Sequence, residues 1–217
     1  MLKKISIGIM ITLISLSSFA GSVIRINQTA DSQASIIRIK QRNSEIFQGI
    51  SSALADVIQS GLENNVDISQ VDSINIAAII NQAGHNNYSE IRQYLAENSR
   101  INLDVTGNNN IAQIRQDHSR NDVITADILG DDNNINIIQG SETYSSNDND
   151  IIYSANGDNN SATLAQYGSN NSINLQQLGN GNQANITQNG EAYEAHLTQA
   201  GTGGIVNLCQ GIDCNEQ

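Results

Sequence analysis

The sequence predicts an all-β protein whose strands stack as a β-solenoid, in which strand–turn–strand rungs lie one above another. Near the C-terminus glutamine recurs at every eleventh position, and each glutamine closes a seven-residue segment followed by four Gly/Asn-rich turn residues. Within each segment, positions 1, 3, 5 and 7 share parity, so in a strand they point to one face. The 217 residues include 31 asparagines, 33 isoleucines, 19 glutamines and no proline, which is the composition of a stacked β-assembly.

The composition excludes several other classes of protein. Aromatic residues make up 4% of the chain and tryptophan is absent, which leaves little material for a conventional globular core. Charged residues at 15% are too few for a coiled coil or a charge-driven disordered chain. A net charge of −12 argues against nucleic acid as a partner.

Residues 1–20 have the pattern of a signal peptide. Lys3 and Lys4 precede an apolar run from Ile5 to Leu16, and Ser18 and Ala20 occupy the −3 and −1 positions of a cleavage site. The run is too short for an ordinary membrane span, although a membrane-anchoring helix is the alternative. We therefore expect an exported mature chain that begins at Gly21, and the loss of the two lysines changes its net charge from −12 to −14.

Residues 21–63 are expected to form an irregular capping region. Two short segments, Ile24–Gln28 and Ile37–Gln41, resemble arms of the repeat. The apolar residues of Ser44–Leu62 fit a helical stripe with Ser44 as N-cap, although Gln48, Gln59 and Gln70 keep the glutamine spacing of the repeat. The sequence favours a short helix over Ser44–Leu62 that covers the exposed first coil.

Residues 64–210 are expected to form the solenoid, built from seven-residue segments that we call arms. Two arms and their turns make one coil of about 22–23 residues, a period typical of repeat architectures. The glutamines that close the regular arms are Gln82, Gln93, Gln116, Gln139, Gln166, Gln177, Gln188, Gln199 and Gln210. The asparagines that open them are Asn87, Asn110, Asn133, Asn160, Asn171 and Asn182. Three arms depart from the pattern and end in Val105, Asp127 and Ala155, the last after an insertion at about Ser141 to Asp148.

The expected inner face pairs a narrow apolar core with asparagine and glutamine ladders. A single buried amide is costly because its donors and acceptors lose water. Stacked amides avoid this cost, since each bonds the identical amide one rung away. In the arm assigned to Asn121–Asp127, the same parity places Asn121, Val123, Thr125 and Asp127 on the inner face.

The arms resemble the curlin repeat, in which Ser/Asn-x5-Gln, a Gly-rich turn and Asn-x-Ala-x3-Gln follow one another. The segment Asn75–Asn87 is similar to the first repeat of minor curlins, which nucleate fibres. The resemblance implies a subunit of an extracellular functional amyloid, with other curlin subunits and an outer-membrane secretion channel as partners. The chain departs from that pattern in its larger number of arms, its acidic tail 211–217 and its two cysteines.

The charges and cysteines raise separate expectations. After Arg120 the chain has twelve acidic and no basic residues, and we expect solvated turns that restrain premature stacking, with calcium binding as the alternative. Cys209 and Cys214 suit an intrachain disulfide in an exported protein; intermolecular links and free thiols remain open.

No enzyme or cofactor signature is evident. His85, His118 and His196 lack metal-site spacing, and the sequence contains no catalytic triad pattern, P-loop or dinucleotide fingerprint. We therefore expect no enzyme, no cofactor and no small-molecule substrate.

The preferred hypothesis is a secreted structural subunit of a curli-like cell-surface fibre, of the minor, nucleating type. The alternatives are the major fibre subunit and a soluble, monomeric β-solenoid adhesin or surface-binding module.

Overall fold

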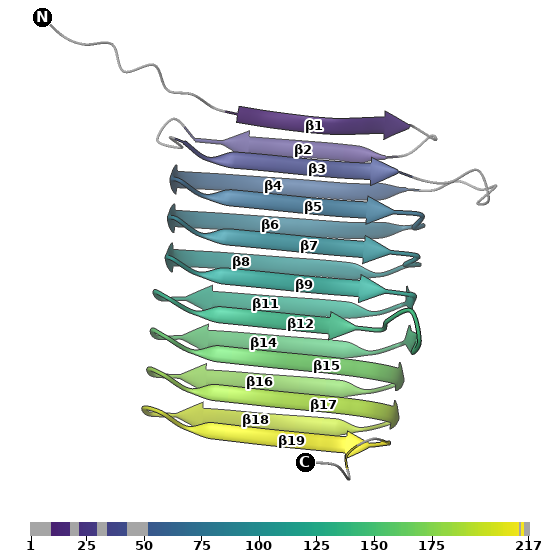
Figure 1. Cartoon of the computed structure of the whole chain (residues 1–217), viewed down its shortest axis with the longest axis vertical. Coiled ribbons are helices and arrows are strands. Elements are labelled where there is room, and N and C mark those ends of the chain that lie inside the picture. The colour runs from purple at the N-terminus through teal and green to yellow at the C-terminus, as the bar shows by residue number, and fades with distance from the viewer. Residues whose placement is uncertain (1–9, 18–21, 30–33, 43–51, 213, 215–217) are drawn as a thin grey trace, which may run out of the picture.

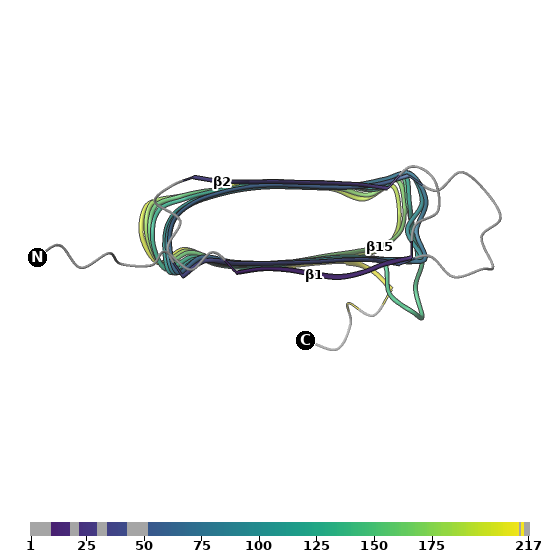
Figure 2. The same cartoon turned by 90° about the horizontal axis from the view of Figure 1, so that it is seen from above.

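The computed structural model describes residues 10–17, 22–29, 34–42, 52–212 and 214. Within this part every regular element is a strand, and the strands stack as a flat β-solenoid (Figure 1). Seen along its axis, each coil is an elongated oval with two long straight sides (Figure 2). The predicted all-β solenoid is therefore confirmed.

Two parallel sheets form the long sides. Sheet B has eight strands and sheet A has eleven. The strands of sheet B are β2 (Val23–Gln28), β4 (Ala53–Leu62), β6 (Ile76–His85), β8 (Arg100–Asn108), β11 (Val123–Leu129), β14 (Asp150–Asn156), β16 (Ser172–Leu178) and β18 (Glu194–Ala200). Those of sheet A are β1 (Met10–Ser17), β3 (Ile36–Arg42), β5 (Asn65–Val71), β7 (Tyr88–Tyr94), β9 (Ile111–Asp117), β10 (Ser119–Arg120), β12 (Asn134–Gln139), β13 (Ser146–Asn147), β15 (Ser161–Ser169), β17 (Gln183–Glu191) and β19 (Ile205–Gly211).

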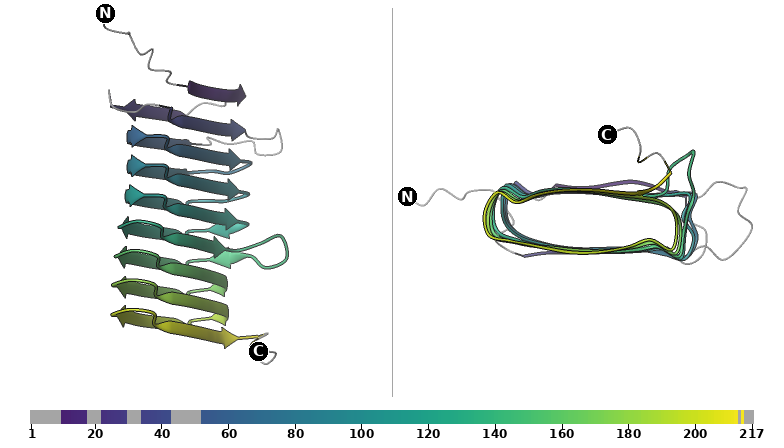
Figure 3. Two further views of the ribbon diagram at one scale, coloured as in Figure 1. Left: turned by 60° about the vertical axis from the view of Figure 1, so that its left-hand side comes forward. Right: turned by 90° about the horizontal axis from the view of Figure 1, so that it is seen from below.

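The register of the strands confirms the coil length that the repeat predicts. Gln70 pairs with Gln93 at a sequence separation of 23, and Gln166 pairs with Gln188 at a separation of 22. One coil is longer, since Gln139 pairs with Gln166, and its extra residues form a loop that projects from the stack (Figure 3). The stack also includes β2, β3 and β4, which precede Asn64.

The prediction of a helix over Ser44–Leu62 is wrong for residues 53–62. Residues 43–51 lie outside the described part, but Ala53–Leu62 is strand β4, paired with β2 and β6. Ala53, Ala55 and Val57 are buried, whereas Ile58 is 45% exposed. With this alternation β4 forms backbone hydrogen bonds with β2 on one side and with β6 on the other. This pairing stabilises the strand more than the helical spacing of the apolar residues would stabilise a helix.

One arm is displaced by a single residue from its expected register. Val123, Thr125 and Asp127 face solvent, and the inward positions belong to Ile124, Ala126 and Ile128. A coil of 23 residues contains two arms and cannot be divided into two equal halves. The step from an inward position of one arm to the equivalent position of the next arm is therefore eleven residues and twelve residues in alternation. A one-residue slip in a strand exchanges its two faces.

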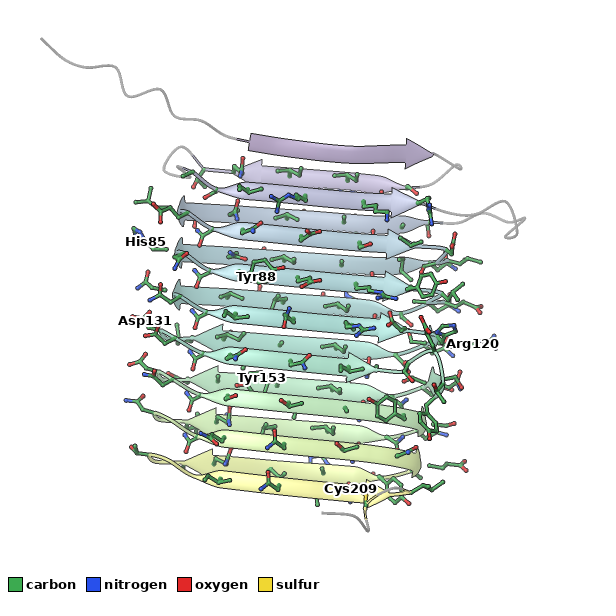
Figure 4. All side chains as sticks on the ribbon, viewed as in Figure 1. His85, Tyr88, Arg120, Asp131, Tyr153 and Cys209 are labelled. Carbon is green, nitrogen blue, oxygen red and sulfur yellow. A yellow bond between two sulfur atoms is a disulfide. The ribbon has the colours of Figure 1, made fainter. Side chains whose placement is uncertain are left out.

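The core between the sheets is narrow and consists mainly of Ile, Leu, Val and Ala. Among the described residues the largest fully buried side chain is that of Tyr153, which is 1% exposed and is labelled in Figure 4. Buried isoleucines stack on one another along each sheet, for example Ile68, Ile91 and Ile114. A core of this thickness has no room for many aromatic rings, which accounts for their scarcity in the sequence.

Candidate functional site: the buried amide ladders

An unbroken glutamine ladder runs along the inside of sheet A. In each rung, Nε2 of one glutamine donates a hydrogen bond to Oε1 of the glutamine in the next coil, at 2.6–3.0 Å. The members, in order, are Gln41, Gln70, Gln93, Gln116, Gln139, Gln166, Gln188 and Gln210. Six of the predicted glutamines therefore lie in one column, and Gln41 and Gln70 extend it.

The same amides also join the two sheets across the core. The second Nε2 proton of a ladder glutamine goes to a backbone carbonyl of a sheet B strand. Gln188 donates to Ser172 O at 3.0 Å, and Gln166 donates to Asp150 O at 3.1 Å. Each amide is thus bonded both along the stack and across it, which is how these polar groups tolerate full burial.

The glutamine column of sheet B is interrupted. Gln28 donates to Gln59 at 2.9 Å and Gln177 donates to Gln199 at 2.9 Å. Between these pairs, the column passes through Gln82 and then through Val105, Ile128 and Ala155, which have no amide. The hydroxyl of Tyr153 donates to Oε1 of Gln177 at 2.7 Å. The hydrogen-bonded column of sheet B therefore resumes at Gln177.

An asparagine column lies at one corner, where sheet B strands turn into sheet A strands. Each Oδ1 accepts the backbone N–H of the corresponding residue in the next coil at 2.9–3.0 Å. Each Nδ2 donates to a glycine carbonyl of the next coil at 2.7–3.2 Å. The members are Asn64, Asn87, Asn110, Asn133, Asn160 and Asn182, and Gly204 follows them.

Apart from the last one, Gly201, the glycine partners of this column leave no space for a side chain. A Cβ on Gly84 would lie 1.9 Å from the carbonyl oxygen of Gly107, and Gly107 has the same relation to Gly130. These glycines also have φ angles of +117° to +135°, which L-residues rarely adopt. The column therefore depends on asparagine and glycine together.

Asn171 lies in a different column at the opposite corner. Its backbone N–H donates to Oδ1 of Asn149 at 2.7 Å, and Asn149 N–H donates to Oδ1 of Asp122 at 2.8 Å. The N–H of Asp122 in turn donates to the Ser99 hydroxyl at 3.3 Å. The structure thus divides the predicted asparagines into two columns, and it places a carboxyl where the pattern has an amide.

Asp122 is a residue that the sequence pattern missed. Its side chain is fully buried. Burial raises the pKa of this carboxyl to about 7, and the nearby Asp148 adds to the shift, while hydrogen bonds from Ser146 and the Asn149 N–H oppose it. A coil period of 23, applied from Ser99, would have placed Asp122 on the inner face.

The charged and sulfur-containing groups lie on the outside or at the corners. Asp117 is buried against two guanidinium groups, with Oδ1 3.2 Å from Arg92 Nε and Oδ2 2.6 Å from Arg115 Nη2. Cys209 and Cys214 form a disulfide beside the C-terminal coil (Figure 4). Among the described residues, no group of three or more His, Cys, Asp or Glu side chains could hold a metal ion.

The histidines belong to three separate coils. His85 ends β6 at one narrow end of the stack (Figure 4), His118 lies at the opposite corner, and His196 is on the outer face of β18. The ring of His118 meets Tyr94 edge-on at 5.7 Å. Within the described ranges, no helix has the length and hydrophobicity of a membrane span.

Parallel coils with continuous amide ladders define a repeat protein of the β-solenoid class, whose inner surface repeats from coil to coil. The family model described as "Curlin associated repeat" matches residues 147–179, which include β14, β15 and β16. Residues 147–179 are therefore similar to the curlin repeat, and the resemblance of the chain to the curlin family is confirmed in this segment. A comparison with curated proteins finds no match.

Proposed function

We propose that this protein is a secreted subunit of an extracellular curli-like amyloid fibre, of the minor type that nucleates polymerisation. In this proposal residues 1–20 direct export, the outer-membrane curli secretion machinery passes the mature chain to the cell surface, and other curlin subunits add to it. The curlin repeat supports a structural, non-enzymatic role. The observation that carries the proposal is the unbroken glutamine ladder from Gln41 to Gln210, because such a ladder can continue into a second chain.

The two ends of the ladder are complementary. At the N-terminal end, Oε1 of Gln28 and of Gln41 is buried without a hydrogen-bond partner among the described residues. At the C-terminal end, the one contact of Gln210 Nε2 within the described part of the chain is with Glu194 O at 3.3 Å. Since every rung of the column runs from Nε2 to Oε1 in chain order, the C-terminal coil of one copy fits the N-terminal coil of another, with sheet A over sheet A.

The strand edges and charges support the same polarity. β18 and β19 each pair with a strand on one side only. β2 and β3 contain Arg25, Arg38, Lys40 and Arg42 and no acidic residue, whereas β18 and β19 contain Glu194 and no lysine or arginine. The edge of β3 pairs with β1, which lies inside the predicted signal peptide, so cleavage after Ala20 would free this edge for the next subunit.

Ladder variants with matched controls test the templating mechanism. We expect the double variant Gln177→Ala/Gln188→Ala to slow thioflavin-reported fibre growth severely, because it removes an inner amide from each sheet. The control Gln176→Ala/Gln183→Ala removes exposed glutamines from the same strands and should leave growth unchanged. Equal growth of the two double variants would refute the ladder mechanism.

Seeding tests the nucleating role. A low molar ratio of this protein should abolish the lag phase of a partner curlin subunit. A fibre that forms from this chain alone, without shortening the partner's lag, would indicate the major subunit instead. A chain that sediments as a monomer and gives no thioflavin signal would support a soluble adhesin.

A further inference from the structure

The longest coil has a loop that projects from the stack (Figure 3). Residues of this loop, together with residues of β15, β17 and β19, line a groove on the outer face of sheet A. Its volume is about 350 Å³. One wall is the loop, with Thr143 and Tyr144, and the floor is formed by outward side chains of β15 and β17, including Tyr167 and Thr187. It is separate from the amide ladders, which face the core.

Two tyrosines dominate the groove, and the loop holds one of them in place. The ring centroids of Tyr144 and Tyr167 are 5.8 Å apart with a tilt of 50°. Ser141 N–H donates to Tyr144 O at 2.7 Å, and Tyr144 N–H donates to Ser141 Oγ at 3.0 Å. Tyr144 remains 46% exposed, so a preformed aromatic surface faces solvent.

The lining carries no charged side chain among the described residues, although the chain after Arg120 is strongly acidic. The polar residues of the lining are Ser141, Thr143, Thr187, Asn189 and the two tyrosines. Burial raises the pKa of the Tyr167 hydroxyl further above its ordinary value of 10, although Arg115 opposes this shift. A charged ligand would find no counter-charge in this lining, whereas an uncharged ligand with many hydroxyls would find both donors and acceptors.

We propose that this groove binds a neutral polysaccharide, with the apolar face of a sugar ring on Tyr144 and Tyr167 and its hydroxyls bonded to the threonines and Asn189. Tyrosine supplies rigid amphipathic contact area, and small polar neighbours supply adaptable hydrogen bonds. A peptide strand would need an unpaired sheet edge, but β15 and β17 are paired on both sides. In an assembled fibre the site would recur once per subunit, which multiplies weak binding.

Affinity electrophoresis of the freshly desalted, non-fibrillar mature chain tests this site independently of fibre growth. We expect hydroxyethyl cellulose, a neutral probe, to retard the wild type, and alginate, an anionic probe, to leave it unretarded. Tyr144→Ala and Tyr167→Ala should each weaken retardation at least about fivefold, as for an aromatic anchor worth about 1 kcal/mol. Circular dichroism would verify that each variant remains folded.

Tyr88→Ala is the matched control, because Tyr88 lies on β7 of the same sheet, several coils from the groove. It should bind hydroxyethyl cellulose like the wild type. The proposal is overturned if the wild type is not retarded, if alginate retards it equally, or if Tyr88→Ala weakens retardation as much as the two groove variants do.

Discussion

Asp122 is the residue at which this protein departs most from its own repeat. An asparagine at this position would supply the same Oδ1 acceptor to the Asn149 N–H without a titratable group. The carboxyl instead has a folded-state pKa of about 7, against 3.8 as its ordinary value. Folding therefore takes up a proton between these pH values, so the contribution of Asp122 to stability is greatest at low pH and is lost as the pH rises through about 7.

We expect the free energy of unfolding to fall as pH rises through 7, by up to about 4 kcal/mol between pH 4 and pH 8.5. Asp122→Asn should remove this dependence and stabilise the protein at pH 8.5. Urea unfolding at both pH values measures the effect. Asp132→Asn, which removes an exposed carboxylate, should keep the wild-type pH dependence; the explanation fails if Asp122→Asn keeps it too.

At the scale of elements, the turns decide how closely coils approach. The asparagine column binds glycine carbonyls, and each glycine lies against the backbone of the next coil. The last glycine of the column, Gly201, is the exception, since a Cβ there would meet nothing within 4 Å. Gly201 and Gly107 have φ angles of +109° and +135°, so a comparison of the two isolates the steric effect from the backbone strain.

Gly107→Ala should lower the free energy of unfolding by about 4 kcal/mol or more, because its Cβ would overlap the Gly130 carbonyl. Gly201→Ala should cost about 2 kcal/mol, which is the backbone strain alone. Thermal and urea unfolding of the two variants provide the comparison. Equal destabilisation would mean that close coil contact is not what selects glycine.

The loop of the longest coil is a second element with a separable role. Ser146 pairs with Ser119 of the preceding coil, and the residues Glu142–Ser145 account for the difference between a 27-residue and a 23-residue coil. The core positions on either side keep their partners across this insertion. The extra residues therefore contribute to the outer groove and not to the ladder.

Deletion of Glu142–Ser145 should leave the melting temperature within a few degrees of the wild type and preserve fibre growth, since surface loops tolerate changes in length. It should also abolish binding to hydroxyethyl cellulose. Calorimetry, thioflavin growth curves and affinity electrophoresis measure the three outcomes. Collapse of the fold would show that the loop is structurally required.

For the whole molecule, the net charge differs between the N-terminal and the C-terminal half of the stack. Residues 21–120 have a net charge of −2, and residues 121–217 have a net charge of −12. Basic residues at the N-terminal end of the stack would face an acidic half of the next subunit in the proposed fibre. Attraction between the ends is screened by salt, with a Debye length of about 30 Å at 0.01 M and about 10 Å at 0.1 M.

Lys40→Glu should therefore slow elongation at about 0.01 M salt severalfold more than Arg100→Glu, which makes the same charge change in the middle of the stack. The difference should shrink at about 0.1 M salt and above. Seeded thioflavin kinetics at several salt concentrations measure it. Identical rates for the two variants would argue against the proposed polarity.

The sequence by itself determined the β-solenoid, the coil length and the inner column of most glutamines, because alternation within an arm is local and each inward residue meets its equivalent one coil away. It also indicated the strands Ile24–Gln28 and Ile37–Gln41, because their apolar residues alternate even though the two segments are not spaced like the regular arms. Its repeated asparagines did not reveal which corner each would occupy, since both corners accept the same residue type.

Only the tertiary structure decided the inward register of β11, the strand over Ala53–Leu62, and the separation of Asn171 from the other predicted asparagines. These depend on whether the step between equivalent positions of two arms is odd or even, because a shift of one residue exchanges the faces of a strand. The length of a turn determines which residues of the next strand face inward only once the neighbouring coil fixes where that strand must lie. Stacking, rather than local preference, therefore placed Asp122 inside the protein and left sheet A with the ladder that runs unbroken.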